Sequence, residues 1–204
     1  KTPCGVEIAD QGTALAGITS QLPTCTPLGA AVNLSNVSVG GGTPGVIPPG
    51  CYSSTGAMSV GSTVTLSGSG VYIFRPGGAL GTAVNSNVSL AAGACSTDVF
   101  WAPVSATTLG ANSSFVGTII GAAGLTMGSS ASMVGRALTA GGTVTTAANS
   151  ITVPSACASP IAPTLTVTKV SNGGTGTFGF SGSNGFANQN IATATSGVGV
   201  SGVT

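Results

Sequence analysis

The sequence predicts a mainly β protein in which a parallel β-solenoid is flanked by one α-helix and followed by a small, incomplete C-terminal β-sheet module. The apolar residues form short clusters of Val, Ile, Leu and Phe, separated by Gly, Ser, Asn and Thr, which is typical of strands joined by turns. A hydrophobic fraction of 42% in 204 residues is enough to bury a core, although only 3% of the residues are charged. The third observation is an internal repeat.

The repeat is clearest between residues 109–120 and 127–138, which match at an offset of 18 residues. Large apolar residues coincide in the two segments, and glycines coincide with glycines. The stacked pairs that this register predicts are Phe115 with Met133 and Val116 with Val134. Looser copies begin at residues 60, 82 and 146. A repeat of this length, with Gly and Asn at its corners, predicts coils stacked about 4.7 Å apart over residues 51–154. The alternative is an antiparallel sandwich with accidental similarity, which the number of positions in register disfavours.

One helix is predicted over residues 8–22. Its apolar residues recur at helical spacing on one face, and Pro23 ends the run. These residues are Ile8, Leu15, Ile18 and Leu22. We expect this face to pack against the solenoid, which follows a loop-rich connection at residues 29–50.

After Pro154 the composition changes to alternating segments rich in Thr and Gly. Residues 164–170, 175–180 and 191–203 are predicted to be strands with one apolar face, joined by turns rich in Asn and Gly. These strands are too few to close a sandwich over that face. We therefore expect two domains, a solenoid with its helix at residues 1–157 and a partial β-sandwich module at residues 158–204.

Composition also excludes several classes of function. The chain has four basic and three acidic side chains, no histidine and a formal net charge of +1. It lacks the basic surface of a nucleic-acid-binding protein, and its apolar runs are too short for membrane insertion. Acid–base catalysis and metal binding both need titratable groups close together. We expect a protein that is not an enzyme, with no catalytic residues, no metal site and no cofactor.

The five cysteines lack the spacing of a zinc site, so disulfides are the better interpretation. From sequence order we expect Cys4 to pair with Cys25 and Cys51 with Cys95. Cys157 would then be unpaired, either buried or bonded to another chain. Disulfides, together with a first residue that is not Met, predict a processed protein that is secreted or held at the cell surface.

Five segments resemble the signature segments of the microbial ice-binding-protein-like β-solenoid family over roughly residues 8–154. They are Gly70–Phe74, Asn87–Leu90, Ala94–Trp101, Leu109–Thr118 and Val134–Leu138. The resemblance implies a right-handed, discontinuous solenoid with a helix packed alongside, secreted or attached to the cell surface. Many members of the family bind ice through one flat face. The segment after Pro154 resembles the start of the β-sandwich modules of bacterial surface adhesins.

In that family a tetrapeptide of Thr, Ala or Gly, any residue, and Thr or Asn carries ice binding. Residues 82–85 and 146–149 match it, whereas the other copies begin with Val60, Leu109 and Met127, which break the threonine ladder. The candidate ice-binding residues are Thr63, Thr82, Asn85, Asn112, Ser130, Thr146 and Asn149. The alternative is that these tetrapeptides are only solenoid corners, because Gly and Asn tolerate a left-handed backbone.

Two functions follow from these features. An unclosed C-terminal sheet, an odd cysteine and a nearly uncharged surface favour a structural or adhesive extracellular protein, whose partners are copies of itself in a surface fibre built by β-strand addition. The alternative is an ice-binding (antifreeze) protein that acts through a flat face bearing Thr and Asn, with ice as the partner. Neither function requires nucleic acid or membrane insertion.

Overall fold

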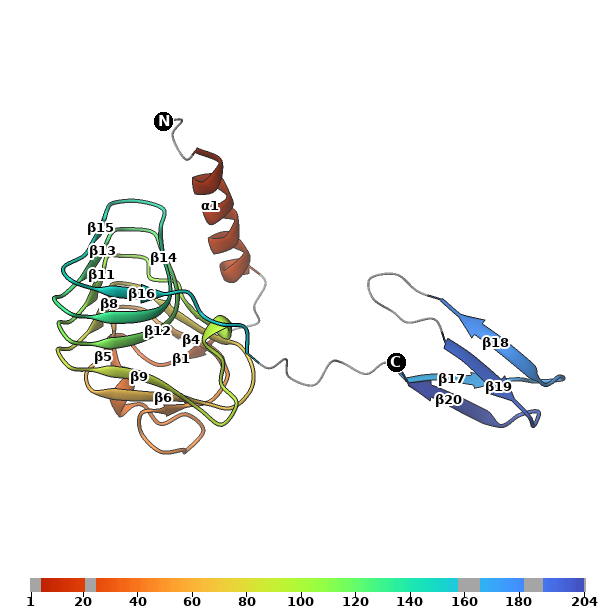
Figure 1. Cartoon of the computed structure of the whole chain (residues 1–204). Coiled ribbons are helices and arrows are strands. Elements are labelled where there is room, and N and C mark those ends of the chain that lie inside the picture. Colours follow the sequence, from red (N-terminus) through yellow and green to blue (C-terminus); the bar gives the residue numbers. More distant parts are fainter. Residues whose placement is uncertain (1–4, 21–24, 158–165, 182–188, 204) are drawn as a thin grey trace. The chain divides into compact units, whose positions relative to one another are not determined.

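The computed structural model describes residues 5–20, 25–157, 166–181 and 189–203. The chain forms two compact units, Lys1–Ala158 and Ser159–Thr204. The first unit is a parallel β-solenoid accompanied by helix α1 (Gly5–Ser20), and the second holds small antiparallel sheets (Figure 1). The predicted fold class is therefore confirmed.

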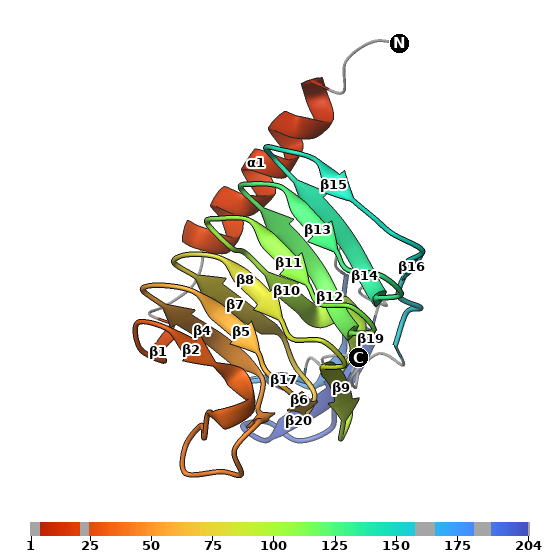
Figure 2. The ribbon, with the colours of Figure 1, turned by 90° about the vertical axis from the view of Figure 1, so that its left-hand side faces the viewer.

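One side of the solenoid is a six-stranded parallel sheet, in the order β15-β13-β11-β8-β5-β2. Its strands are β2 (Val32–Asn33), β5 (Met58–Val60), β8 (Leu80–Thr82), β11 (Thr107–Leu109), β13 (Leu125–Met127) and β15 (Val144–Thr145). Each strand pairs with the equivalent strand of the next coil. In Figure 2 this sheet faces the viewer as a regular stack.

A ten-stranded sheet bends to form the other two sides. The helix side consists of β1 (Thr26–Pro27), β4 (Gly50–Ser54), β7 (Tyr72–Pro76), β10 (Val99–Trp101) and the second halves of β12 (Ser114–Gly121) and β14 (Ser132–Thr139). The third side consists of β3 (Val46–Ile47), β6 (Thr63–Ser67), β9 (Asn87–Ala91), the first halves of β12 and β14, and β16 (Ser150–Thr152). Two short 3₁₀ turns complete this unit, η1 (Leu34–Asn36) and η2 (Ser96–Asp98).

The predicted register is confirmed by the pairing of β12 with β14. The two strands are parallel, and Phe115 lies beside Met133 and Val116 beside Val134. Phe115 and Met133 are both buried in the core. The 18-residue repeat is therefore the length of one coil at this point of the stack.

Aromatic rings form a continuous stack through the core. The centroid of Phe74 lies 5.6 Å from that of Tyr52 and 4.1 Å from that of Trp101, and Trp101 lies 5.0 Å from Phe115. The Trp101 Nε1–H donates to the Val116 carbonyl at 2.9 Å, so its polar atom is satisfied inside the core. One aromatic residue from each of four successive coils thus fills the interior.

Helix α1 runs from Gly5 to Ser20 rather than over 8–22, and residues 21–24 lie outside the described part of the chain. The helix lies along the coils on the helix side (Figure 2). There, Ile73 and Ile120 point outward from the sheet and yet are buried. Leu15 is half-buried and lines a groove of about 460 Å³ together with Arg75 and other sheet residues. The side chains of Ile18 and Leu22 lie outside the described residues.

The expected disulfide pairing is wrong. Cys25 is bonded to Cys51, and Cys95 to Cys157, so Cys157 is not the unpaired cysteine. Cys4 lies outside the described residues. The physical reason is the coil register: Thr26 pairs with Tyr52, which places the preceding cysteines side by side one coil apart. Sequence order cannot show which cysteines stand at the same corner of the stack.

The second unit consists of two antiparallel strand pairs. β17 (Thr166–Val170) pairs with β20 (Gly199–Val203), and β18 (Gly176–Phe180) pairs with β19 (Gln189–Thr193). Ile191 is buried, and the Lys169 ammonium lies 4.4 Å from the centre of the Phe178 ring. Among the described helices none is long and apolar enough to cross a membrane.

Gly117 marks the bend of β12, and its replacement provides a test of the corner. Its φ is +114°, and an added β-carbon would lie 2.6 Å from Val99 Cγ1 and 2.8 Å from Trp101 Nε1. We expect Gly117→Ala to lower the free energy of unfolding by about 2 kcal/mol or more, because it combines backbone strain with overpacking of the core. Gly81→Ala is the matched control, since its β-carbon would meet nothing within 4 Å. Chemical denaturation of both variants measures the difference, and equal stabilities would contradict this account of the corner.

The buried tyrosines predict a loss of stability at high pH. Burial, with a smaller contribution from Tyr52, raises the pKa of Tyr72 to about 12. Because the folded state holds this proton more tightly than the unfolded state, the stabilisation is complete below pH 10 and is lost as the pH rises toward 12. A pKa difference of about 2 corresponds to roughly 2–3 kcal/mol. Thermal melts between pH 8 and pH 11.5 should show this decline, and Tyr72→Phe should make it shallower.

Candidate functional site

The outer face of the six-stranded sheet carries one central row of side chains in register. The row consists of Asn33, Ser59, Gly81, Thr108, Thr126 and Thr145. The neighbours of Thr126 in its strand, Leu125 and Met127, are buried, so strand alternation directs Thr126 outward. Thr108 occupies the same position in the preceding coil, and both threonines are exposed.

Small residues flank this row on both sides. On one side are Ala57, Ala79, Ala106, Gly124 and Thr143, whose carbonyls each accept the N–H of a residue one coil earlier. On the other side are Gly61, Ala83, Gly110, Gly128 and Ala147. Because almost all of these residues are Ala or Gly, nothing bulky rises beside the central row. The face is therefore a low-relief surface with threonines in the later half of its central row.

The hydroxyls of the central row differ in their availability. Within the described residues, the hydroxyls of Thr108, Thr126 and Thr145 have no hydrogen-bond partner. The Asn33 side-chain oxygen accepts the N–H of Ser35 at 3.1 Å and that of Gly61 at 3.0 Å. The hydroxyls of the later coils are therefore free to bond to something outside the protein.

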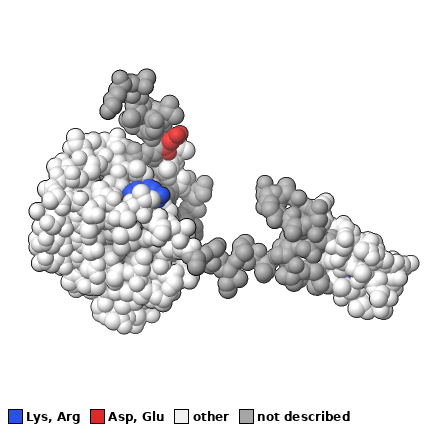
Figure 3. All heavy atoms as spheres, viewed as in Figure 1, with Lys and Arg blue, Asp and Glu red and all other residues white. Residues whose placement is uncertain are grey.

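This face also carries no charge, because none of the residues in its three rows is ionisable. Figure 3 shows a surface that is almost entirely uncharged over the described residues in that view. The described part of the chain contains no group of three His, Cys, Asp or Glu residues that could hold a metal ion. The arrangement thus offers an array of hydroxyl and methyl groups rather than a pocket with reactive groups.

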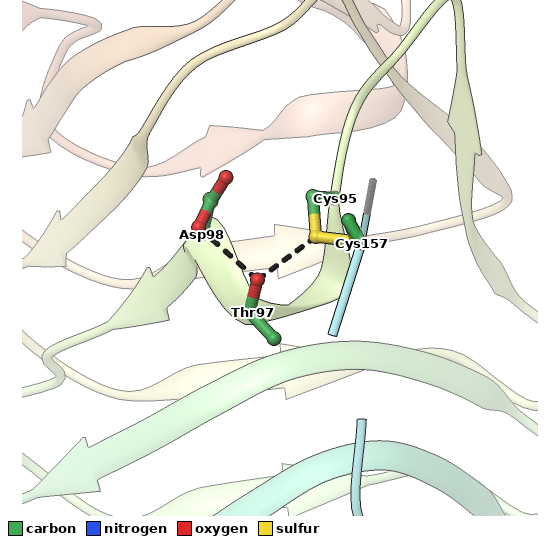
Figure 4. The surroundings of a disulfide bond; sticks show 4 residues. All are labelled: Cys95, Thr97, Asp98 and Cys157. Carbon is green, nitrogen blue, oxygen red and sulfur yellow. Dashed lines mark hydrogen bonds between the residues drawn. A yellow bond between two sulfur atoms is a disulfide. The ribbon is translucent and has the colours of Figure 1, made fainter. Parts of the chain in front are cut away.

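The other two sides of the solenoid are less open. Helix α1 lies along the helix side. On the third side, η2 contacts β12 and β14, and the Cys95–Cys157 disulfide holds the segment after β16 against it (Figure 4). There the Thr97 hydroxyl donates to the Asp98 carboxylate at 3.1 Å and lies 2.8 Å from Cys95 Sγ. Among the described residues, no helix or 3₁₀ turn is seen to lie over the face of the six-stranded sheet.

The structure does not bring the seven candidate residues from the sequence into one row. Asn85, Asn112 and Ser130 stand at successive corners with φ of 58°, 55° and 58°, as the corner interpretation predicts. Thr63 pairs with Asn87, so it begins a strand of the third side.

The remaining three candidates lie near the edge of the face. The Thr82 hydroxyl accepts the Gly110 N–H at 2.8 Å, and Thr82 shares the register of Val60, which is buried. Thr146 follows the end of β15 and is exposed. The Asn149 side chain donates to the carbonyls of Gly128 and Ala131 at 2.7 and 3.0 Å, and so joins two coils.

The tetrapeptide pattern identified residues at the corner of the coils, and it did not identify the central row of threonines. A signal for that row was present in the sequence. Thr108 and Thr126 each stand immediately before the large apolar residue that begins a tetrapeptide, Leu109 or Met127, and Thr145 stands before Thr146. An outward residue between inward ones in the same position of each coil is what period-two alternation predicts.

Comparison with known proteins identifies the architecture. Residues 8–152 match a protein-family model described as ice-binding-like. The chain belongs to the ice-binding-like family. This membership confirms the resemblance seen in the signature segments, and it accords with the expectation that the chain is not an enzyme.

Individual ice-binding proteins are similar over part of the chain. An ice-binding protein of Flavobacterium frigoris is 35% identical over 96 residues, which are 46% of this chain and 34% of the relative. One from Lentinula edodes is 40% identical over 88 residues, which are 41% of this chain and 31% of the relative. The matched segments thus span about a third of these curated relatives. The crystal structure of an ice-binding protein from the Antarctic ascomycete Antarctomyces psychrotrophicus has a TM-score of 0.65 and 26% identity, covering 73% of this chain and 70% of that one.

These comparisons overturn the first functional expectation. The interpretation as a structural or adhesive protein that assembles into a surface fibre by β-strand addition is wrong, because the two relatives and the solved structure reported above are ice-binding proteins. None of these matches supports the resemblance of the C-terminal segment to an adhesin module. The segment does form the antiparallel pairs β17–β20 and β18–β19, and its assignment as a partial β-sandwich module at residues 158–204 stays a prediction.

Proposed function

We propose that this chain is an ice-binding (antifreeze) protein that contacts ice through the outer face of the six-stranded sheet. The observation that carries the proposal is the row of exposed threonines in register, Thr108, Thr126 and Thr145, whose hydroxyls have no partner within the described residues. Membership of the ice-binding-like family supports the same function. Family membership supports ice binding in general, whereas the residues of this chain indicate which face would contact ice.

Affinity for a crystal surface has to come from many weak contacts that match the lattice at once. The coil stack repeats about every 4.7–4.8 Å, and alternate residues along a strand lie about 6.6 Å apart. Each threonine presents a hydroxyl and a methyl group. The hydroxyl can donate a hydrogen bond to a water oxygen, and the apolar methyl group restricts the orientations of the water beside it. A face with these two fixed repeats can order water in two dimensions.

Such matching also requires a rigid face. Threonine is restricted at χ1 because it is β-branched, so the row loses little side-chain entropy when it binds. Beneath it, Leu125 and Met127 are buried in the close-packed core, and backbone hydrogen bonds connect each strand to the next. The threonine side chains and their backbone are therefore already ordered in the folded protein, so little further conformational entropy is lost when the face binds.

The seven candidate residues take a secondary place in this proposal. Asn85, Asn112 and Ser130 border the face at its corner, and Thr146 extends it at the last coil. Thr82 and Asn149 stabilise that corner through their bonds to neighbouring coils. Thr63 lies on the third side and would not contact ice bound to this face.

The proposed setting is extracellular. The disulfides Cys25–Cys51 and Cys95–Cys157 form and persist in oxidising compartments. A secreted or surface-held protein would meet ice that forms in the surrounding water. Self-assembly plays no part in this proposal.

Replacing one central threonine by a long charged residue tests the function. We expect Thr126→Lys to lower thermal hysteresis by about tenfold or more, because a long charged side chain in the middle of the row keeps the flat face from ice and would have to lose its hydration there. The side chain is exposed, so the free energy of unfolding should change by about 0.5 kcal/mol or less.

Ser114→Lys is the matched control, because Ser114 is exposed at the start of β12 on the third side. It should retain the thermal hysteresis and ice shaping of the unmodified chain. If the unmodified chain shows neither activity, the proposed function is wrong; if Ser114→Lys loses activity and Thr126→Lys does not, the face is wrong.

A further inference from the structure

The outer face of the six-stranded sheet is not uniform along the stack. Its central row begins with Asn33, Ser59 and Gly81 and ends with Thr108, Thr126 and Thr145. The first three residues are half-buried and the last three are exposed. The two halves of the row therefore offer different groups to an approaching surface.

In the first half the protein's own backbone occupies the polar groups. The Asn33 oxygen accepts two backbone N–H groups, and the Ser59 hydroxyl donates to the Val32 carbonyl at 3.2 Å. The neighbouring Thr82 hydroxyl is likewise bonded to the Gly110 N–H. A polar group that already has a good partner gains little by exchanging it for water in ice.

Gly81 interrupts the row between Ser59 and Thr108. It contributes neither a hydroxyl nor a methyl group, so the nearest hydroxyls on either side of it are two coils, or about 9.5 Å, apart. The fold does not require glycine at this position. An added β-carbon would meet nothing within 4 Å, and the residue is not among those with positive φ.

We infer that the ice contact is confined to the last three coils of the face, and that Gly81 is the residue at which it ends. This inference rests on the proposed function. It assigns to Thr108, Thr126 and Thr145 the whole of the central contact, and to Ser59 and Asn33 a structural role. It follows that the area of ice contact can be extended, because Gly81→Thr would add a threonine from a fourth coil to the row.

Gly81→Thr is the decisive variant. We expect its thermal hysteresis at equal molar concentration to rise about twofold or more, because the row of threonines would then extend over four coils instead of three. Gly81→Ala is the matched control, since it removes the glycine and adds a side chain without a hydroxyl. Ser114→Thr adds the same methyl group on the third side and should leave the activity unchanged. Thermal melts of all variants confirm that each is folded.

A second pair of variants tests the other half of the row. Ser59→Ala should retain the activity of the unmodified chain, because its hydroxyl is directed to the Val32 carbonyl. Thr126→Ala should lower it. Equal losses in Ser59→Ala and Thr126→Ala, with both proteins folded, would show that contact reaches the first coils and would overturn the inference.

The outcomes separate this inference from the proposed function. Absence of thermal hysteresis in the unmodified chain would overturn the proposed function itself. An active chain that loses activity in Thr126→Lys but gains none in Gly81→Thr would overturn only the inference about the limit of contact. An equal gain in Gly81→Ala and Gly81→Thr would also overturn it, because the gain would then come from a stiffer strand.

Discussion

The register between successive coils is the constraint on which the rest of the structure depends. Parallel backbone hydrogen bonds join each strand to its equivalent one coil away, and alternation along the strand decides which side chains enter the core. In β12 and β14 this register is unbroken from Ser114 beside Ser132 to Gly121 beside Thr139. A slip of one residue would move Phe115 and Met133 out of the core, and it would turn every outer row inward. The aromatic stack and the threonine row are thus two consequences of one alignment.

Coils of unequal length preserve this alignment by placing the difference at corners and on the third side. Val60 pairs with Thr82 and Thr63 with Asn87, so the corner between them is two residues longer in the later coil. The insertion that carries η2 and Cys95 also falls between β9 and β10, outside the six-stranded sheet. The six-stranded sheet keeps its pairing from β2 to β15. The extra residues of the longer coils therefore lie where they do not disturb the regular pairing of the six-stranded sheet.

The sequence repeat was sufficient to predict the parallel solenoid, because stacking of Phe115 on Met133 needs only equal spacing. It was not sufficient to locate the central row of exposed threonines. A four-residue pattern such as 82–85 identifies a corner, where local backbone conformation selects Asn and Gly, whereas Thr126 is distinguished only by pointing away from the core. The disulfides were mispredicted for a related reason: Cys25 and Cys51 are neighbours across the stack, and their order along the chain does not show this.

Under the proposed function the chain would work near the freezing point of water, and this gives the two disulfides a particular role. Hydrophobic stabilisation weakens on cooling, so a core built from apolar and aromatic side chains contributes less near 0 °C than at room temperature. A stack of coils also tends to fray from its ends, where each coil has a neighbour on one side only. Cys25–Cys51 ties the first coil to the second, and Cys95–Cys157 ties the segment beyond the last coil back to the body of the solenoid. Covalent bonds do not break on cooling. The two disulfides therefore hold the ends of the stack, which are the parts that would unfold first as hydrophobic stabilisation weakens.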